Sequence, residues 1–234
     1  MVEIRTPIEV NEAIKRVMQH ANRGKTQLVP LEKSHGYFLA EDLICDHPVP
    51  PFDRTRYDGF AVRSIDTKNK ATELEVVGEI GAGSVFSDVV GKNEAVRIMT
   101  GAQIPAGCDA VIMLEDVEEF VRDGKPFIRF DKILSSMENI TEQGEDAKKG
   151  EVLAEKGTYI NPGVMALLAT FGYKHVSCIA KPKVGILSTG SELLPVDASL
   201  EPGKIRDSNS YMLIGQIERA GGTPIPLGQF ADDF

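Results

Sequence analysis

The sequence predicts a multidomain protein of class α/β plus β. An α+β linker domain is interrupted by a small inserted β domain and followed by the start of a parallel α/β domain. Three observations predict this arrangement. Apolar residues recur at helical spacing on both sides of the central part of the chain, and short alternating runs fill that central part. The last part has the pattern of a strand, a glycine turn, a helix and a second strand. We expect a discontinuous linker domain at 1–46 and 142–177, a β-barrel-like domain at 47–141, and an incomplete α/β domain at 178–234.

The first predicted element is an amphipathic helix that begins near Thr6. Thr6 and Glu9 have the spacing of a capping box, and Pro7 occupies the favoured first helical position. Apolar residues then recur at helical spacing, namely Val10, Ala13, Ile14, Val17 and Met18. A strand over 26–31 and a second helix starting near 35–37 complete this part.

The middle of the chain has the pattern of a compact β domain. Short apolar or alternating runs are separated by Gly, Asp and Asn, as turns require. No helix-length periodic segment interrupts the runs, which favours a small barrel or sandwich. The predicted strands lie at 61–63, 74–77, 95–99, 110–113 and 127–130.

Helical spacing returns after Asn161, and a parallel α/β pattern follows from Lys183. A strand over 184–188 is followed by a glycine turn, a helix that Ser208 caps, and a second strand near 223–227. One such unit cannot cover both faces of a parallel sheet. We therefore expect the chain to end inside a domain, with apolar surface beyond about residue 178 loosely packed or covered by a partner chain.

Composition excludes some classes of protein and narrows the way in which a ligand would be held. A formal charge of -9 argues against nucleic-acid binding, which uses clustered Lys and Arg. No apolar run approaches the roughly 20 residues that span a bilayer, and three scattered cysteines are typical of reduced thiols. We expect a cytoplasmic protein that holds an anionic ligand through backbone N–H groups or a divalent cation.

Three segments in the first two thirds of the chain carry candidate site residues. Asp53 and Asp58 lie on a Pro- and Gly-rich turn, Thr100 ends an apolar strand, and Asp146 follows Gly144-Glu145. Each segment also has an ordinary structural interpretation. In the order given, these are a solvated turn with Asp53 as a capping residue, a loop that connects two strands, and an exposed salt-bridged turn. On chemistry alone, that interpretation is favoured for all three.

A fourth segment is a stronger candidate, because its residue types and its position agree. Ligands of open α/β sheets bind beyond the carboxyl ends of strands, where hydroxyls and glycine N–H groups can hold phosphate or a polar ring edge. The candidates are Ser188, Thr189, Gly190, Ser191 and Glu192. Asp207 and Asn209 follow at a helix start and could face the same crevice, but plain helix capping is a strong alternative for them. Asp232 lies after the next strand, where an acidic pair is ordinarily solvated.

The order of these motifs resembles the molybdopterin molybdenumtransferase family, which includes bacterial MoeA and the E domain of gephyrin. The matching stretches are Pro-Phe-Asp with Asp-Gly-Phe-Ala, Thr-Gly-Ala with Asp-Ala-Val, Gly-Glu-Asp, Ser-Thr-Gly-Ser-Glu-Leu and Asp-Ser-Asn. The resemblance covers nearly the whole chain. One departure is Thr55-Arg56-Tyr57, where the family usually has Ser-Ala-Met; the bulkier Arg56 and Tyr57 could narrow the pocket.

The resemblance implies a Mg²⁺-dependent transferase that inserts molybdate into adenylylated molybdopterin and releases AMP. It implies catalytic roles for Asp58, Thr100, Asp146 and Glu192, substrate binding by Ser188, Thr189, Gly190, Ser191, Asp207 and Asn209, and Mg²⁺ binding by Glu192 and Asp232. It also implies a homodimer whose linker domain serves dimerisation, a molybdopterin-binding role for 178–234, and a possible molybdopterin adenylyltransferase partner.

Two alternatives stay open at this point. Chains of the gephyrin type also serve as scaffolds for partner proteins, although a scaffold need not keep Thr100, Asp146 and Glu192 together. Molybdate and tungstate nearly match in size and charge, so the sequence favours neither. Relatives of full length continue beyond the end of this sequence, so we expect this chain to be inactive alone.

Overall fold

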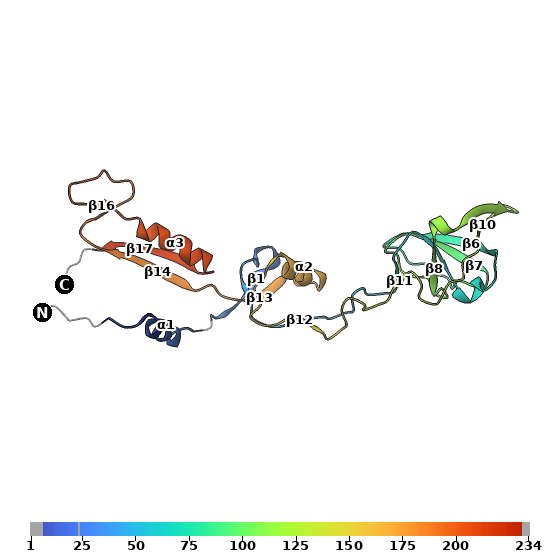
Figure 1. Cartoon of the computed structure of the whole chain (residues 1–234), viewed down its shortest axis with the longest axis horizontal. Helices are drawn as coiled ribbons and strands as arrows, with labels where there is room; N and C mark the ends of the chain where they lie inside the picture. The colour runs from blue at the N-terminus through green and yellow to red at the C-terminus, as the bar shows by residue number, and fades with distance from the viewer. Residues whose placement is uncertain (1–6, 23, 231–234) are drawn as a thin grey trace. The chain divides into compact units, whose positions relative to one another are not determined.

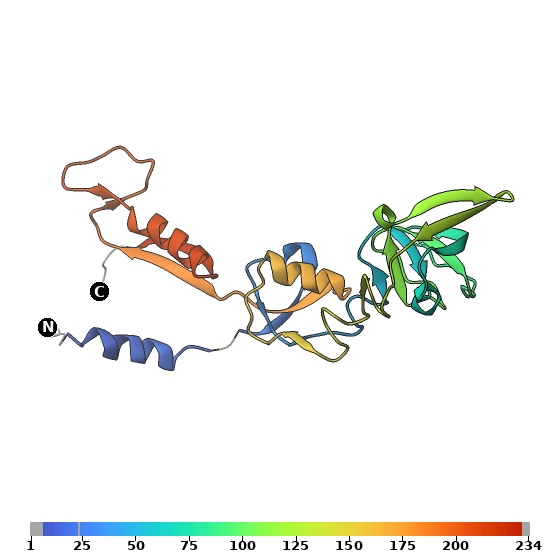
Figure 2. The same cartoon turned by 45° about the vertical axis from the view of Figure 1, so that its right-hand side comes forward.

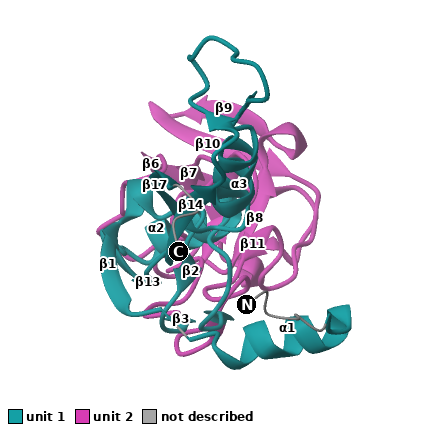
Figure 3. Cartoon of the chain, turned by 90° about the vertical axis from the view of Figure 1, so that its left-hand side faces the viewer, with its two compact units in different colours: residues 1–43, 153–234 teal, residues 44–152 magenta. Residues whose placement is uncertain are grey.

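The computed structural model describes residues 7–22 and 24–230. The fold is mixed α/β, with many short strands and few helices (Figure 1). The chain divides into two compact units, residues 1–43 with 153–234 and residues 44–152, which Figure 3 colours separately. The three-domain division expected from the sequence stays a prediction. Among the described residues, no helix is both long and apolar enough to cross a membrane.

Unit 44–152 is built on a six-stranded sheet in the order β8-β5-β7-β6-β10-β9. Only β6 and β7 pair in parallel; every other neighbouring pair in this sheet is antiparallel. The predicted runs all form strands here. Their bounds are β5 Gly59–Val62, β6 Thr72–Ile80, β7 Glu94–Ile98, β8 Ala110–Met113, β9 Glu118–Arg122 and β10 Lys125–Phe130.

Shorter elements complete this unit. β4 and β11 form a separate two-stranded sheet, and β3 pairs with β12; the boundary in sequence between the two units falls within each of these last two strands. Two 3-10 turns, η2 and η3, follow β5 and β8. The bounds are β3 Leu43–Ile44, β4 Arg54–Thr55, η2 Ser64–Thr67, η3 Leu114–Asp116, β11 Ile140–Thr141 and β12 Val152–Ala154.

The core of this unit lies on both faces of the sheet, and β5 shows why. All four residues of β5 are buried. Successive side chains of a strand point to opposite faces, so Phe60 and Val62 join one buried cluster and Ala61 joins the other. Burial on both faces explains why Gly59–Val62 is apolar throughout and does not alternate with polar residues.

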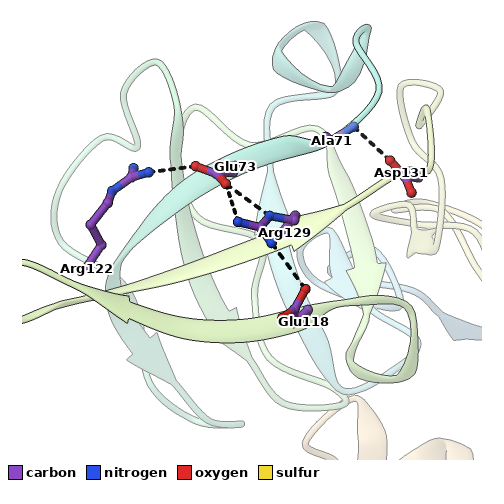
Figure 4. A network of polar contacts seen from close by, with 6 residues as sticks. All are labelled: Ala71, Glu73, Glu118, Arg122, Arg129 and Asp131. Atoms are coloured by element: carbon purple, nitrogen blue, oxygen red, sulfur yellow. Dashed lines mark hydrogen bonds and ion pairs between the residues drawn. The ribbon is translucent and has the colours of Figure 1, made fainter.

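An ion-pair network on β6, β9 and β10 orients the edge of the sheet (Figure 4). Glu73 Oε1 accepts hydrogen bonds from Arg129 at 2.7 and 3.0 Å, and its Oε2 accepts one from Arg122 at 2.7 Å. These donors, Arg129 first, hold the pKa of Glu73 below its ordinary value. Arg129 also pairs with Glu118 at 3.5 Å. Such solvent-exposed pairs orient strands more than they stabilise the fold.

Unit 1–43 with 153–234 brings together strands that are distant in the sequence. β1 Thr26–Pro30 and β2 Phe38–Leu39 flank β13 His175–Ile179 in an antiparallel sheet. α2 Pro162–Thr170 precedes β13, and Asn161 caps it by accepting a hydrogen bond from the N–H of Val164 at 2.9 Å. These elements are visible from a second direction in Figure 2.

The first helix begins later than predicted. α1 spans Val10–Gln19, and the extended backbone of Glu9 at its N-cap leaves Pro7 before the helix. The predicted cap, Thr6, lies outside the described residues. None of the residues of α1 is buried, so its apolar face, formed by Val10, Ile14, Val17 and Met18, is exposed.

The predicted second helix near residues 35–40 is wrong. The chain forms a 3-10 turn, η1 Leu31–Lys33, and then enters strand β2. Gly36 has a φ of +78°, a left-handed conformation that ends a helical turn and that glycine adopts readily. Phe38 then pairs with Ile179 of β13, so strand pairing takes up this segment.

The C-terminal part of this unit is the predicted strand, helix and strand. β14 Lys183–Thr189 pairs in parallel with β17 Thr223–Phe230, and α3 Asn209–Arg219 connects them after the small β15 Leu193–Leu194 and β16 Ile205–Arg206 pair. None of the residues of α3 is buried. As expected, this part exposes apolar side chains, among them Leu187, Ile205, Tyr211, Met212, Leu213 and Leu227.

Replacement of Gly59 by alanine tests the close packing of β5. A Cβ at Gly59 would lie 2.0 Å from the carbonyl oxygen of Ile112, a backbone atom that cannot rotate away. We expect Gly59→Ala to lower the free energy of unfolding by about 2–3 kcal/mol, measured by urea denaturation. The control is Gly81→Ala, whose Cβ would meet nothing within 4 Å and should change stability by less than about 0.5 kcal/mol. Equal effects of the two changes would contradict this packing.

Candidate functional site

Residues 50–58, which we call the central segment, join the first two motifs by backbone pairing. The carbonyl of Thr55 accepts a hydrogen bond from the N–H of Gly101 at 3.1 Å. The carbonyl of Asp53 accepts one from the N–H of Ile104 at 2.9 Å. The loop after β7 is therefore held along the central segment, although about fifty residues separate the two in sequence.

The third motif is attached to the same segment from a different part of the chain. The Asp53 carboxylate accepts a hydrogen bond from the N–H of Gln143 at 2.7 Å, and the Gln143 side chain donates to the Pro51 carbonyl at 2.7 Å. The N–H of Gly144 donates to the Pro50 carbonyl at 3.0 Å. Three motifs that are separate in sequence therefore meet at residues 50–58.

Asp58 and Thr100 are in direct contact. Asp58 Oδ1 accepts hydrogen bonds from both the backbone N–H and the hydroxyl of Thr100, each at 2.7 Å. The backbone donor, then the hydroxyl, hold the pKa of Asp58 below its ordinary value, and Arg97 nearby adds to this. Both residues are exposed. An exposed carboxylate that stays ionised at neutral pH is available to accept further hydrogen bonds.

A surface hollow of about 610 Å³ lies beside the central segment. Arg56 and Tyr57 line it together with residues of the third motif segment, 137–148. Its charged lining residues are Arg56, Lys148, Glu142 and Glu145, two of each sign. The residues that depart from the usual family motif therefore form part of this wall.

Asp146 lies next to the hollow but is not joined to Asp58 or Thr100. Its backbone N–H donates to the Val49 carbonyl at 2.9 Å, which fixes the position of the turn. The side chain is exposed, and within residues 7–22 and 24–230 its carboxylate accepts no hydrogen bond. Of the predicted catalytic residues in unit 44–152, the structure thus pairs Asp58 with Thr100 and leaves the Asp146 carboxylate open to solvent.

The other unit forms a crevice at the carboxyl end of β14. About 290 Å³ in volume, it is lined by four of the predicted substrate-binding residues, Ser188, Thr189, Asp207 and Asn209. A neighbouring hollow of about 350 Å³ shares Ser188 and Asp207 and is lined mainly by apolar groups. This placement agrees with the rule that ligands of open α/β sheets bind beyond the strand ends.

Asp207 caps the helix start, in place of the predicted cap Ser208. Its carboxylate accepts hydrogen bonds from the Ser210 hydroxyl at 2.5 Å and the Ser210 N–H at 3.1 Å, while the Ser208 side chain makes no capping bond. The Ser210 donors hold the pKa of Asp207 low. Ser188 Oγ lies near enough to contribute, yet it is buried and makes no hydrogen bond within the described part of the chain. Asp207 therefore caps α3 while also lining the crevice, and its role in substrate binding stays a prediction.

Glu192 lies in the turn after β14 and outside the lining of both hollows. Gly190 has a φ of +139°, and the Glu192 carboxylate folds back over it, within 3 Å of the point where a Cβ would stand. Ser191 and Glu192 are exposed. Asp232, the second predicted metal ligand, lies outside the described residues, among which no three His, Cys, Asp or Glu side chains form a metal-binding group.

Sequence reasoning did not single out Glu145 or Asp109 as individual residues. It favoured a salt-bridged turn at residues 144–146, and Glu145 does form an ion pair, with Arg56 at 2.9 Å, but the partner was not predicted. Asp109 accepts hydrogen bonds from the Ser64 N–H at 2.6 Å and hydroxyl at 2.7 Å. Burial acts to raise the pKa of Asp109, but these donors outweigh it and the pKa is lowered. Contacts across tens of residues leave no local signal in one sequence.

Removal of the Thr100 hydroxyl tests the Asp58 contact. We expect Thr100→Val to raise the pKa of Asp58, because one of its two donors is lost, whereas Thr100→Ser should keep it low. The pKa is read from the side-chain carboxyl chemical shift during an NMR titration. A carboxylate whose pKa is lower in the folded state stabilises the fold at pH values above its unfolded-state pKa of about 3.9. This contribution to stability is lost as the pH falls through the folded-state pKa. The valine variant should therefore show a weaker acid dependence of stability; an unchanged pKa would contradict the contact.

Comparison with known proteins agrees with this arrangement. The model of the MoeA N-terminal region (domain I and II) matches residues 8–172. Over the whole chain, the sequence is 52% identical to a molybdopterin molybdenumtransferase of Bacillus subtilis (strain 168), of which it covers 55%. Over 94% of the chain it is 46% identical to one of Staphylococcus aureus (strain N315), of which it covers 53%.

A solved structure shows the same fold. The crystal structure of a molybdopterin biosynthesis moeA protein from Pyrococcus horikoshii OT3 superposes with a TM-score of 0.86 and 40% identity, over 95% of this chain and 60% of that one. The chain spans about half the length of the curated relatives that it matches. With its ordered motifs, its matched N-terminal region and this shared fold, the chain belongs to the MoeA family.

Proposed function

We propose that the chain serves molybdenum cofactor biosynthesis as part of a molybdopterin molybdenumtransferase. The reaction is insertion of molybdate into adenylylated molybdopterin, with release of AMP. The observation that carries the proposal is the pair of hydrogen bonds from Thr100 to Asp58, which joins two family motifs around one exposed, ionised carboxylate. The names of the relatives support the class of reaction and the pterin substrate.

In the proposed reaction, Asp58 is a hydrogen-bond acceptor that orients the substrate. An ionised carboxylate can only accept hydrogen bonds, so its partners must be donors, such as a pterin N–H or a protonated oxygen. Thr100 lowers the pKa of Asp58 through two hydrogen bonds to Oδ1, so Oδ2 is the oxygen proposed to accept from the substrate. Orientation of this kind lowers the entropic part of a reaction barrier without covalent chemistry.

The crevice at the end of β14 is the proposed position of the phosphate or pterin groups. Ser188 and Thr189 offer hydroxyls, Asn209 offers an amide, and α3 presents its N-terminal N–H groups at the same edge. Gly190 and Ser191 are proposed to contribute backbone donors from the adjoining turn. These neutral groups bind anions through hydrogen bonds, and Arg206 in the same lining adds one positive side chain.

The carboxylates of this part of the chain fit Mg²⁺ only in a site where water and substrate oxygens supply most of the ligands. Glu192 supplies one exposed carboxylate, and Mg²⁺ typically takes one or two carboxylates with water and substrate phosphate oxygens. We therefore propose that Glu192 holds Mg²⁺, with Asp232 as a second ligand. When bound, the ion would neutralise charge on phosphoryl oxygens.

Assembly and location are also proposed by similarity to the family. The apolar face of α1 and the exposed apolar side chains of α3 support a homodimer, because monomers rarely expose large apolar patches. A molybdopterin adenylyltransferase would supply the adenylylated substrate in the cytoplasm. A scaffold role of the gephyrin type is not favoured, since scaffolding does not require the contact between Thr100 and Asp58.

The experiment measures AMP release from adenylylated molybdopterin with molybdate and Mg²⁺. We compare this chain alone with a chimera in which the remaining part of the Bacillus subtilis relative is joined to it. The chimera should release AMP only when molybdate and Mg²⁺ are present, and the chain alone should not. An inactive chimera beside an active relative would contradict the proposed function.

Glu192→Ala in the chimera tests the metal assignment. Turnover should fall by roughly a hundredfold, because the metal-held charge neutralisation is lost. The unfolding midpoint should stay unchanged, because the side chain is exposed. Glu201→Ala, which removes an exposed carboxylate paired with Lys204, is the matched control. Unchanged turnover of Glu192→Ala in Mg²⁺ would rule out this role for Glu192.

A further inference from the structure

Arg56 is fixed on the surface by several contacts, unlike most exposed arginines. Its Nη2 donates to both carboxylate oxygens of Glu145 at 2.9 and 3.0 Å, and its Nε donates to the Thr141 hydroxyl at 3.0 Å. Its backbone N–H donates to the Asn139 carbonyl at 3.2 Å. The guanidinium therefore spans from the central segment to the turn that carries Asp146.

Glu145 is fixed from a second direction as well. Its carboxylate accepts a hydrogen bond from the N–H of Glu142 at 3.2 Å, and its own N–H donates back to the Glu142 carbonyl at 3.1 Å. Gly144 enters the turn with a φ of +75°. The turn is thus tied at its backbone to Val49 and Pro50 and at its side chain to Arg56.

This pairing also changes the charge that the turn presents. Glu145 and Asp146 are adjacent carboxylates, and two uncompensated negative charges would repel an anionic substrate. Arg56 compensates Glu145, while the Asp146 carboxylate makes no hydrogen bond in the described part of the chain. The hollow is lined by two basic residues, Arg56 and Lys148, and two acidic ones, Glu142 and Glu145, so the lining carries no net charge.

We propose that Arg56 is a positioning residue that fixes the Gly144-Glu145-Asp146 turn, so that of the two adjacent carboxylates Glu145 is compensated and that of Asp146 is presented to an anionic substrate. The proposal rests on the proposed function for the identity of that substrate. It gives a specific purpose to the departure from the usual Ser-Ala-Met motif: the arginine replaces a small side chain with a tether. Lysine would serve poorly, because its single ammonium cannot reproduce the planar guanidinium, which holds Glu145 through Nη2 and Thr141 through Nε.

The test compares Arg56→Ala, Arg56→Lys, Glu145→Gln and the Arg56→Ala/Glu145→Gln double variant in the full chain. The matched control is Arg122→Ala, which removes another exposed arginine of the same unit that is paired with a glutamate. Amide hydrogen exchange of residues 142–147 is the first measurement, and the unfolding midpoint is the second.

We expect Arg56→Ala to speed exchange across 142–147 by roughly fivefold, the factor that corresponds to about 1 kcal/mol at 25 °C. Glu145→Gln should do nearly the same, the double variant should add little more, and Arg56→Lys should restore part of the protection. Arg122→Ala should leave this segment unchanged. None of the variants should shift the unfolding midpoint appreciably, because these pairs are exposed.

Turnover of the chimera separates positioning from a purely structural role. Arg56→Ala should lower kcat by about tenfold with KM changed by less than about twofold, because a misplaced Asp146 costs orientation in the transition state. Unchanged exchange across 142–147, additive single variants, or an unchanged kcat in an active chimera would each overturn the inference. Failure of the proposed function shows instead as an unsubstituted chimera that releases no AMP.

Discussion

The backbone and side-chain hydrogen bonds of residues 50–58 are the constraint on which the site of unit 44–152 depends. The carbonyls of Thr55 and Asp53 in this segment accept hydrogen bonds from the loop after β7. The carbonyls of Pro50 and Pro51 and the Asp53 carboxylate accept hydrogen bonds from the Gly144 turn. Neither loop belongs to the six-stranded sheet. Loops whose polar groups find partners on one segment of the chain acquire a defined position that their own residues could not specify.

The charges of the site follow a consistent logic. Most of its carboxylates are already engaged: Asp53 by Gln143, Asp58 by Thr100, and Glu145 by Arg56. A hydrogen-bonded carboxylate stays ionised but presents less negative charge to a ligand than a free one does. An acidic protein can in this way keep several carboxylates near a polyanion and leave only selected ones uncompensated. In the α/β part, the crevice at the end of β14 offers hydroxyls and helix N–H groups, with Arg206 in the same lining.

The sequence predicted what depends on local pattern. The apolar runs at 61–63, 95–99 and 110–113 form strands because period and turn residues act over a few positions. The helix near 35–40 failed because Gly36 adopts a left-handed conformation and Phe38 pairs with a strand 140 residues away. The Asp58 and Thr100 motifs were found from their order along the chain, but their direct contact was not, and neither was the Arg56 pair. Such contacts depend on tertiary pairing, and a single sequence carries no record of it.

Native-state amide exchange of the whole chain, followed through a series of low denaturant concentrations, tests the central claim most directly. The amides of Gly101, Ile104 and Gly144 all donate to carbonyls of residues 50–58. If this segment holds both loops, their exchange should be governed by one shared opening, with a common free energy and a common dependence on denaturant. An exchange of Gly144 orders of magnitude faster than that of Gly101 and Ile104 would show that the third motif is not held there, and would contradict the account.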